Sequence, residues 1–203
     1  MHERAPVEWG IAARCRLGEA TTGDVAVVHL LPEGALVAGI DGLGHGSEAA
    51  RAARRAAAVM RASPGDDLVQ LVQRCHRALR GTRGAAISVA FVSASESRMT
   101  WLGVGNVEGR VLRADQAATR TKGSLALARG VPGHELPPMR AATIAVQPGD
   151  VLLLATDGVD AGFADSLELS GSSQTISERI LSDHWKPSDD ALVIVVRYLG
   201  MRR

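Results

Sequence analysis

Ile40-Asp41-Gly42-Leu43-Gly44-His45-Gly46 is the stretch around which the rest of this chain is organised. It closes an apolar run, residues 35–40, which predicts a buried strand, and it opens a segment rich in alanine and arginine. The predicted strand thus carries the carboxylate of Asp41 at its tip. The glycines that follow allow a tight turn and a close approach of the backbone to a bound group. Because an isolated Asp-Gly pair is usually only a turn, this stretch alone does not establish a site.

Three further aspartates stand in similar settings, at the boundaries of apolar runs that predict buried strands. Asp24 and Asp189 each precede such a run, and Asp157 follows one. These positions are far apart in the sequence, so local turn formation does not explain why all of them fall at strand ends. Four carboxylates in this setting indicate a common site rather than four unrelated turns.

The composition favours a globular protein of one domain, residues 1–203, with an ordinary core. The chain has 23 basic and 22 acidic residues and a net charge of +1, which gives no reason to expect nucleic acid or a membrane surface as a partner. No segment approaches the length of a membrane span, and no apolar signal-peptide core occurs near the N-terminus. Cys15 and Cys75 form neither a disulfide framework nor a zinc motif. We therefore expect a cytoplasmic protein.

The order of the predicted elements indicates the fold class. Apolar patterns predict strands at residues 5–16, 24–31, 35–41, 86–91, 99–104, 110–112, 143–146, 151–155 and 192–196, helices at residues 47–62, 66–81 and 176–181, and a long loop with one short strand at residues 115–140. Strands, two adjacent helices, strands again and a late helix do not give the alternation of a parallel doubly wound sheet. They predict an α+β fold, a four-layer α/β/β/α sandwich of two mostly antiparallel sheets flanked by helices.

The helix predicted at residues 47–62 has two distinct faces. Alanines and Met60 form the face that packs, whereas the opposite face carries Arg51, Arg54, Arg55 and Arg61. The arginines are open to interpretation as a phosphate-binding patch, but a solvated helix face is the simpler interpretation.

Clustered aspartates at strand ends have a specific chemistry. Mg²⁺ and Mn²⁺ prefer oxygen ligands, and carboxylates are the usual protein ligands. One carboxylate can bridge two such ions roughly 3.5–4 Å apart, which makes a shared water acidic enough to attack phosphorus. The chain has no GxSxG elbow, and neither cysteine lies in a glycine-rich turn that would activate it. A metal-dependent hydrolase without a protein nucleophile fits this pattern.

Four short motifs occur in order along the chain. They are Asp41-Gly42-Leu43-Gly44-His45-Gly46, Gly105-Asn106, Ala155-Thr156-Asp157-Gly158-Val159 and Asp189-Asp190. In this order they resemble the motifs of the metal-dependent serine/threonine phosphatases, the protein phosphatase 2C (PPM) superfamily. The first motif resembles the bacterial SpoIIE/RsbU/RsbX branch, which acts in sporulation and general stress signalling. The resemblance extends from about residue 23 to residue 196.

The resemblance implies a phosphatase with two divalent ions, Mn²⁺ or Mg²⁺, as cofactors. By position, Asp41 would bridge both ions, and the backbone carbonyl of Gly42 would complete the protein ligands of the second. Asp157 and Asp189 would hold the first ion. Asp24 would not bind an ion directly but would orient metal-bound water.

Some assignments stay open on the sequence alone. Asp190 is an alternative to Asp189 as the ligand, and Asp189 is preferred because the apolar strand begins two positions later. The phosphate-gripping arginine of many eukaryotic relatives has no clear counterpart, and Arg14 and Arg16 are candidates only by proximity. His45 matches a motif position, but as a bare residue it is most simply a histidine at a helix start.

A narrower resemblance rests on what the chain lacks. The segment between Gly105 and Asp157 leaves little room for the flap of larger relatives, and we expect no sensor domain before the core. With its Gly130-Val131-Pro132-Gly133 loop, such a core most resembles the stand-alone stressosome phosphatase RsbX. This implies a monomer that dephosphorylates STAS-domain scaffold proteins as a negative feedback regulator of sigma-B-type stress signalling. Residues 115–140 are expected to help dock the partner, because this loop is long and lies between site motifs.

Other functions compete with this interpretation. A GHKL-type ATP-binding kinase would need a glycine where Leu43 stands and an Asn-rich helix box, which is missing. A catalytically inactive PPM-fold binding module is disfavoured by the intact aspartates. A dinucleotide-binding enzyme would use Gly103 and Gly105, but the third glycine falls at Gly109 and a strand rather than a helix follows.

Overall fold

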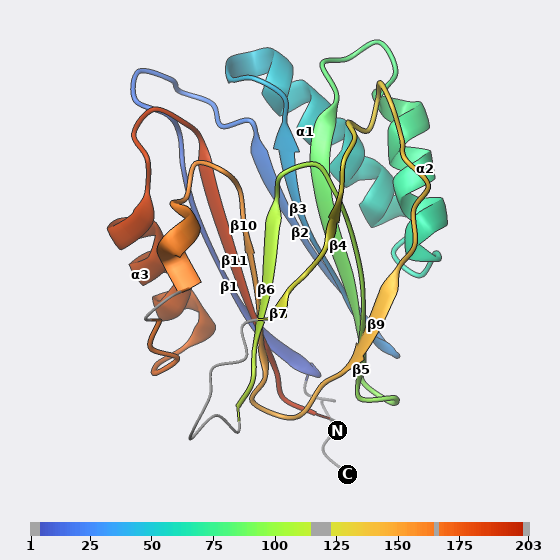
Figure 1. Ribbon diagram of the computed structural model, residues 1–203, viewed down its shortest axis with the longest axis vertical. Coiled ribbons are helices and arrows are strands. Elements are labelled where there is room, and N and C mark those ends of the chain that lie inside the picture. The colour runs from blue at the N-terminus through green and yellow to red at the C-terminus, as the bar shows by residue number, and fades with distance from the viewer. Residues whose placement is uncertain (1–4, 115–122, 165–166, 201–203) are drawn as a thin grey trace.

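Two β-sheets packed face to face, with helices on both outer faces, form the protein (Figure 1). The computed structural model describes residues 5–114, 123–164 and 167–200. The predicted α/β/β/α sandwich is thereby confirmed. The prediction that residues 1–203 form one domain without a flap or sensor domain stays a prediction. No helix in the described ranges has the length and apolar character that a membrane crossing needs.

The first sheet, called sheet A, has the strand order β1-β11-β10-β6-β7. Its strands are β1 (Val7–Arg14), β6 (Glu108–Leu112), β7 (Gly123–Ser124), β10 (Val151–Ala155) and β11 (Ala191–Tyr198). All neighbouring pairs in this sheet are antiparallel. Strand β11 is buried over nearly its whole length because it lies between two strands and two core layers.

The second sheet, called sheet B, has the order β2-β3-β4-β5-β8, with β9 also paired to β5. Its strands are β2 (Asp24–Leu31), β3 (Gly34–Gly42), β4 (Ala85–Ser93), β5 (Arg98–Val104), β8 (Leu127–Ala128) and β9 (Ala142–Ala145). Only the β5–β8 pair is parallel. The segment expected to hold one short strand thus contains two, β7 and β8. Both are only two residues long, too short for a recognisable alternation of apolar residues. Part of the predicted docking loop, residues 115–122, lies outside the described residues.

Three helices cover the sandwich. Helices α1 (Gly46–Ala62) and α2 (Leu68–Leu79) pack against sheet B, and α3 (Ser173–His184) packs against β1 and β11 of sheet A. A short 3₁₀ helix, η1 (Ala161–Ala164), lies beside α3. Helix α3 is longer than the predicted residues 176–181 because Ser172 caps its N-terminus through a hydrogen bond to the Thr175 N–H. Asp67 caps α2 in the same way.

Three apolar layers hold the sandwich together. One lies between α1, α2 and sheet B, a second between the two sheets, and a third between sheet A and α3. Six alanines on one face of α1 are fully buried, which lets this helix approach sheet B closely: Ala49, Ala50, Ala52, Ala53, Ala56 and Ala57. Aliphatic packing of this kind fixes the two sheets relative to each other, and so fixes the strand ends that carry the aspartates.

Candidate active site

The four strand ends that carry the aspartates lie at the same end of the sandwich (Figure 1). Strands β2 and β11 begin there, whereas β3 and β10 end there, as the antiparallel pairing of each sheet requires. Sheet B contributes Asp24 and Asp41, and sheet A contributes Asp157, Asp189 and Asp190. The candidate site therefore bridges the two sheets.

Asp24 and Asp41 are direct partners in the β2–β3 pairing, so their side chains project from the same face of sheet B. Asp24 is buried, with only 5% of its surface exposed. Its Oδ2 accepts a hydrogen bond of 2.7 Å from the Thr156 hydroxyl, which in turn accepts one of 2.9 Å from the Leu192 N–H. The Thr156 side chain thus ties the start of β2 in sheet B to the end of β10 and the start of β11 in sheet A.

Asp157 is held from both its side chain and its backbone. Its Oδ2 accepts a hydrogen bond of 2.6 Å from the Asn106 amide, and its carbonyl oxygen accepts one of 2.9 Å from the Lys186 ammonium group. The carboxylate is otherwise exposed. Asn106 leaves the second oxygen, Oδ1, available to a ligand.

The neighbours Asp189 and Asp190 differ in what their carboxylates contact. Asp190 is only 4% exposed, and its two oxygens accept hydrogen bonds from the Arg16 N–H at 2.8 Å and the Gly23 N–H at 2.7 Å. Asp189 is half-buried, and its Oδ1 accepts only the N–H of the next residue at 2.9 Å. Asp190 therefore fastens the loop before β2, whereas Asp189 keeps an oxygen free of described donors.

Gly42 brings the backbone of the first motif against helix α1. A side chain at this position would begin 2.1 Å from the Ala49 carbonyl oxygen, so only glycine fits. The Gly42 N–H donates to the Gly23 carbonyl, and the next N–H, that of Leu43, donates to the Gly84 carbonyl. These contacts fix the turn immediately after Asp41.

The aspartates lie close enough to repel one another. Burial, followed by the charges of Asp24, Asp157, Asp189 and Asp190, raises the pKa of Asp41 from 3.8 to about 8. The pKa of Asp24 is likewise raised to about 7, because burial and the neighbouring carboxylates together outweigh the hydrogen bond from Thr156, which lowers it. Such crowding of carboxylates is costly unless a cation compensates it, so it points to a functional site.

Residues 32–199 match the sequence model of the family described as Stage II sporulation protein E (SpoIIE). The chain belongs to the SpoIIE family. This confirms the resemblance that the motifs predicted, because the phosphatase domain of SpoIIE is of the PP2C type. No curated protein matches the chain significantly.

Solved structures share the fold over almost the whole of this SpoIIE-family chain. One is 33% identical to this chain, with a TM-score of 0.86 over 94% of this chain and 99% of its own. It was described in work on the bacterial stressosome as a modular system that has been adapted to control secondary messenger signalling. RsbX in complex with magnesium is 19% identical, with a TM-score of 0.85 over 97% of both chains. The catalytic domain of the serine/threonine phosphatase PstP with two manganese ions is 16% identical, with a TM-score of 0.69 over 96% of this chain and 99% of its own.

The residues of this SpoIIE-family site fit divalent metal ions. All the side chains that crowd together are carboxylates, which hard cations prefer. In the described ranges no three His, Cys, Asp or Glu side chains converge closely enough to enclose one ion. Mg²⁺ does not need such a cage, because it keeps several waters and is usually held by one or two carboxylates. An open cluster of carboxylates agrees both with the crowding of the aspartates and with the absence of a closed cage in the described ranges.

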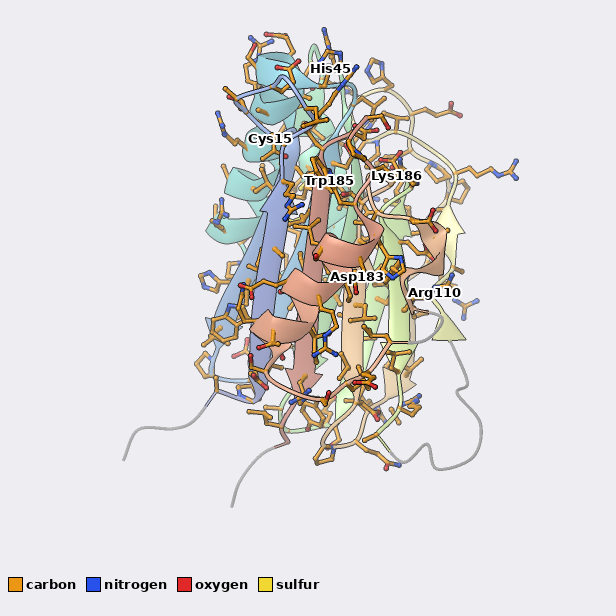
Figure 2. The ribbon with its side chains drawn as sticks, turned by 90° about the vertical axis from the view of Figure 1, so that its left-hand side faces the viewer. Cys15, His45, Arg110, Asp183, Trp185 and Lys186 are labelled. Atoms are coloured by element: carbon orange, nitrogen blue, oxygen red, sulfur yellow. The ribbon has the colours of Figure 1, made fainter. Side chains whose placement is uncertain are left out.

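The structure also places the residues whose roles the sequence left open, of which His45 is labelled in Figure 2. His45 is the N-cap residue of α1, as expected, and its Nδ1 lies 2.8 Å from Glu19 Oε1. The guanidinium of Arg14 lies 5.1 Å from the ring centre of Trp185, and Arg16 contacts the site through its backbone. Neither arginine has a described contact that identifies it as a phosphate ligand.

Three partners of the aspartates carried no assigned role in the sequence analysis. Asn106 and Thr156 were recognised only as members of motifs, and Lys186 was not singled out. The sequence gives no local signal for their contacts, which join residues 29 to 132 positions apart. In this SpoIIE-family chain they position Asp157 and Asp24.

Replacement of Asp24 by asparagine should change how the stability of the metal-free protein depends on pH. The folded state raises the pKa of Asp24 from 3.8 to about 7, so the folded chain keeps a proton that the unfolded chain loses. Stability is therefore lost as pH rises through this window. Asparagine cannot ionise but can still accept the Thr156 hydroxyl. We expect Asp24→Asn to exceed the wild type in stability by about 1–4 kcal/mol near pH 8.5 and to match it only when the pH falls below the unfolded-chain pKa of 3.8.

Urea denaturation in the presence of a chelator measures this difference. Addition of Mn²⁺ serves as the internal control, because a cation at the site should remove the wild type's loss of stability at high pH. A constant difference between the two proteins from low to high pH would contradict the assigned burial of an ionisable Asp24.

Proposed function

We propose that this chain is a metal-dependent serine/threonine protein phosphatase that hydrolyses phosphoserine and phosphothreonine. Its family and fold are those of protein phosphatases. The observation that carries the proposal is the convergence of carboxylates from four strand ends, where burial and mutual repulsion raise the pKa values of Asp24 and Asp41. A site of this charge needs cations, and a phosphoryl group is a substrate whose charge two cations can neutralise.

In this proposal two divalent ions are held by Asp41, the Gly42 carbonyl, Asp157 and Asp189. When bound, such ions acidify water and neutralise phosphoryl oxygens. Asp41 is assigned the bridging position because it is surrounded by all the other carboxylates and receives no hydrogen bond that lowers its pKa. Asp157 offers the oxygen that Asn106 leaves unoccupied.

Other residues of the chain keep these ligands in place. Thr156 fixes the orientation of the buried Asp24 carboxylate, which lies next to Asp41 in the strand pairing. Lys186 holds the backbone of Asp157 and adds positive charge at the edge of the cluster. Because these contacts come from both sheets, the aspartates are positioned before any ion binds, which limits the reorganisation that binding requires.

We further propose that the substrates are phosphorylated STAS-domain proteins and that the enzyme limits stress signalling by negative feedback in the cytoplasm. Two similarities support this: the 33% identical protein comes from work on the bacterial stressosome, and RsbX shares the fold over 97% of both chains. We also propose that the enzyme is a monomer. The two free cysteines, Cys15 and Cys75, agree with a reducing cytoplasm.

Phosphate release from a phosphorylated STAS-domain protein tests this function. With Mn²⁺ the wild type should hydrolyse the folded protein with a kcat/KM at least about 10-fold above that for a peptide with the same phosphosite, because a folded partner offers additional contacts. A chelator should stop both reactions. Equal kcat/KM for protein and peptide would contradict the STAS assignment alone, whereas no metal-dependent hydrolysis of either would contradict the phosphatase and indicate an inactive binding module.

A further inference from the structure

The positive charge of the chain is concentrated on one side of the sandwich. Residues 46–83, which span helices α1 and α2, contain eight arginines and three acidic residues, a net charge of +5. The whole chain has a net charge of +1, so the remaining residues sum to −4. A polarity of this size creates a potential that attracts anionic partners to one face.

Five of these arginines have no anionic partner among the described residues. Arg51 pairs with Glu48, Arg74 pairs with Asp66, and Arg61 donates to the Ala26 carbonyl. The other five are exposed and form what we call the arginine surface: Arg54, Arg55, Arg77, Arg80 and Arg83. Their charges are available to an external partner.

The two helices bring these arginines to one level of the molecule. Helices α1 and α2 run in opposite directions side by side, and the thiol of Cys75 contacts the Ala56 carbonyl oxygen at 3.7 Å. Arg77 lies two positions after Cys75, and Arg54 lies two positions before Ala56. Because the helices are antiparallel (Figure 1), the Cys75–Ala56 contact implies that these two arginines lie at about the same height along the helix pair.

The arginine surface reaches the rim of the candidate active site. Helix α2 ends at the site end of the sandwich, where its connection to β4 carries Arg83. The Nη1 atom of Arg83 lies 2.8 Å from the point where a side chain on Gly44 would begin. Gly44 belongs to the turn that follows Asp41, so a guanidinium group borders the loop of the bridging aspartate.

A neighbouring loop extends this edge. The carbonyl of Pro132 accepts the Ala85 N–H, and His134 Nε2 lies 3.0 Å from the Arg83 carbonyl oxygen. The loop at residues 130–135 thus packs where α2 ends. The pKa of His76 agrees with a positive potential at this place, because burial, followed by the charges of Arg80 and Arg77, lowers it.

We propose that the arginine surface docks an acidic surface of the phosphoprotein substrate and leads its phosphorylated residue into the aspartate site. The proposal rests on the phosphatase function proposed above. It assigns selectivity to charged residues of the two helices, in addition to the loop at residues 115–140. A cationic surface at the edge of the site attracts an acidic partner and orients it toward the aspartates.

The composition of the surface favours a protein over a membrane or a nucleic acid. The exposed large apolar residues of the described chain, Trp9, Leu17, Leu30 and Leu199, all lie outside α1 and α2, so these helices offer no side chains for insertion into a bilayer. Residues 46–83 also contain no aromatic residue on which a base could stack. The interaction that the arginine surface does offer is charge complementarity with a folded acidic protein.

Two phosphoserine peptides of equal length, one with glutamate flanks and one with serine flanks, test the proposal. The wild type should hydrolyse the acidic peptide with a kcat/KM about 10-fold higher at low salt, and high salt should reduce this ratio. Arg77→Glu/Arg80→Glu should bring the ratio to about one or below. The ratio is taken within each variant, so it does not depend on the integrity of the aspartate site.

For a matched comparison, Arg77→Glu alone is measured beside an equal charge reversal, Arg98→Glu, at the opposite end of sheet B, where Arg98 pairs with Ser93. The Arg98→Glu protein is the control. This variant should keep the wild-type ratio. An equal fall of the ratio in Arg98→Glu, or no fall in Arg77→Glu/Arg80→Glu, would overturn the docking proposal while hydrolysis of both peptides still upheld the phosphatase. Wild-type binding to phosphatidylserine vesicles or single-stranded DNA at physiological salt, lost in Arg77→Glu/Arg80→Glu, would overturn it in favour of a membrane or a nucleic acid.

Discussion

Asp41→Asn and Asp157→Asn should each lower the Mn²⁺-dependent release of phosphate by more than about 100-fold, since even residues that only support a metal ligand contribute 10–100-fold. Asparagine keeps the size of each side chain but removes the charge that holds a cation. The fold should survive, because the Asp157 carboxylate is exposed and Asp41 itself destabilises the metal-free fold through its raised pKa. Initial rates on a phosphoserine peptide and on a small aryl phosphate measure the effect.

Asp160→Asn is the matched control for these variants. Asp160 lies three positions after Asp157 and is likewise exposed, but the one described contact of its carboxylate is the hydrogen bond that Oδ1 accepts from the Gly162 N–H. This variant should keep nearly all the activity. Thermal unfolding of each protein separates lost function from lost folding. Activity close to that of the wild type in a folded Asp41→Asn protein would exclude this aspartate from the site.

The positions of the aspartates at strand ends could be predicted from the sequence because strand ends and apolar runs are local features. In an antiparallel sheet, strands that begin and strands that end alternate, so Asp24 and Asp41 had to meet once their two strands paired. The order of strands and helices also predicted the sandwich, since no parallel doubly wound sheet has two adjacent helices between runs of strands.

Long-range side-chain contacts could not be predicted from the sequence. The bond from Thr156 to Asp24 joins residues 132 positions apart, and the one from Asn106 to Asp157 spans 51 positions. No periodicity records such pairs, because each depends on how two sheets pack rather than on local propensity. The arginines of α1 were predicted as a solvated face. Only the packing of α1 beside α2 and the position of Arg83 against Gly44 connect them with the site.

Adjacent residues pose a different problem. Asp189 and Asp190 both precede strand β11, and the sequence distinguished them only by their spacing from the apolar run. In the structure Asp190 accepts two backbone N–H groups and is almost fully buried, whereas Asp189 is half-buried and accepts one. This difference favours a structural role for Asp190 and leaves Asp189 as the proposed ligand.

Calorimetric titration with Mn²⁺ should therefore give three distinct results for three variants. Asp41→Asn should weaken both ions, because the bridging carboxylate serves both, and Asp189→Asn should weaken one by more than about 100-fold while the other stays near its wild-type affinity. Asp190→Asn should instead lower the free energy of unfolding by about 1–3 kcal/mol. The asparagine amide has one acceptor oxygen, so either the Arg16 N–H or the Gly23 N–H loses its acceptor. The folded fraction of this variant should still bind both ions. Loss of one ion in Asp190→Asn with none in Asp189→Asn would exchange the two assignments. Loss of the same single ion in Asp41→Asn and Asp189→Asn would contradict the bridging role, because a carboxylate shared by two ions cannot be removed without weakening both.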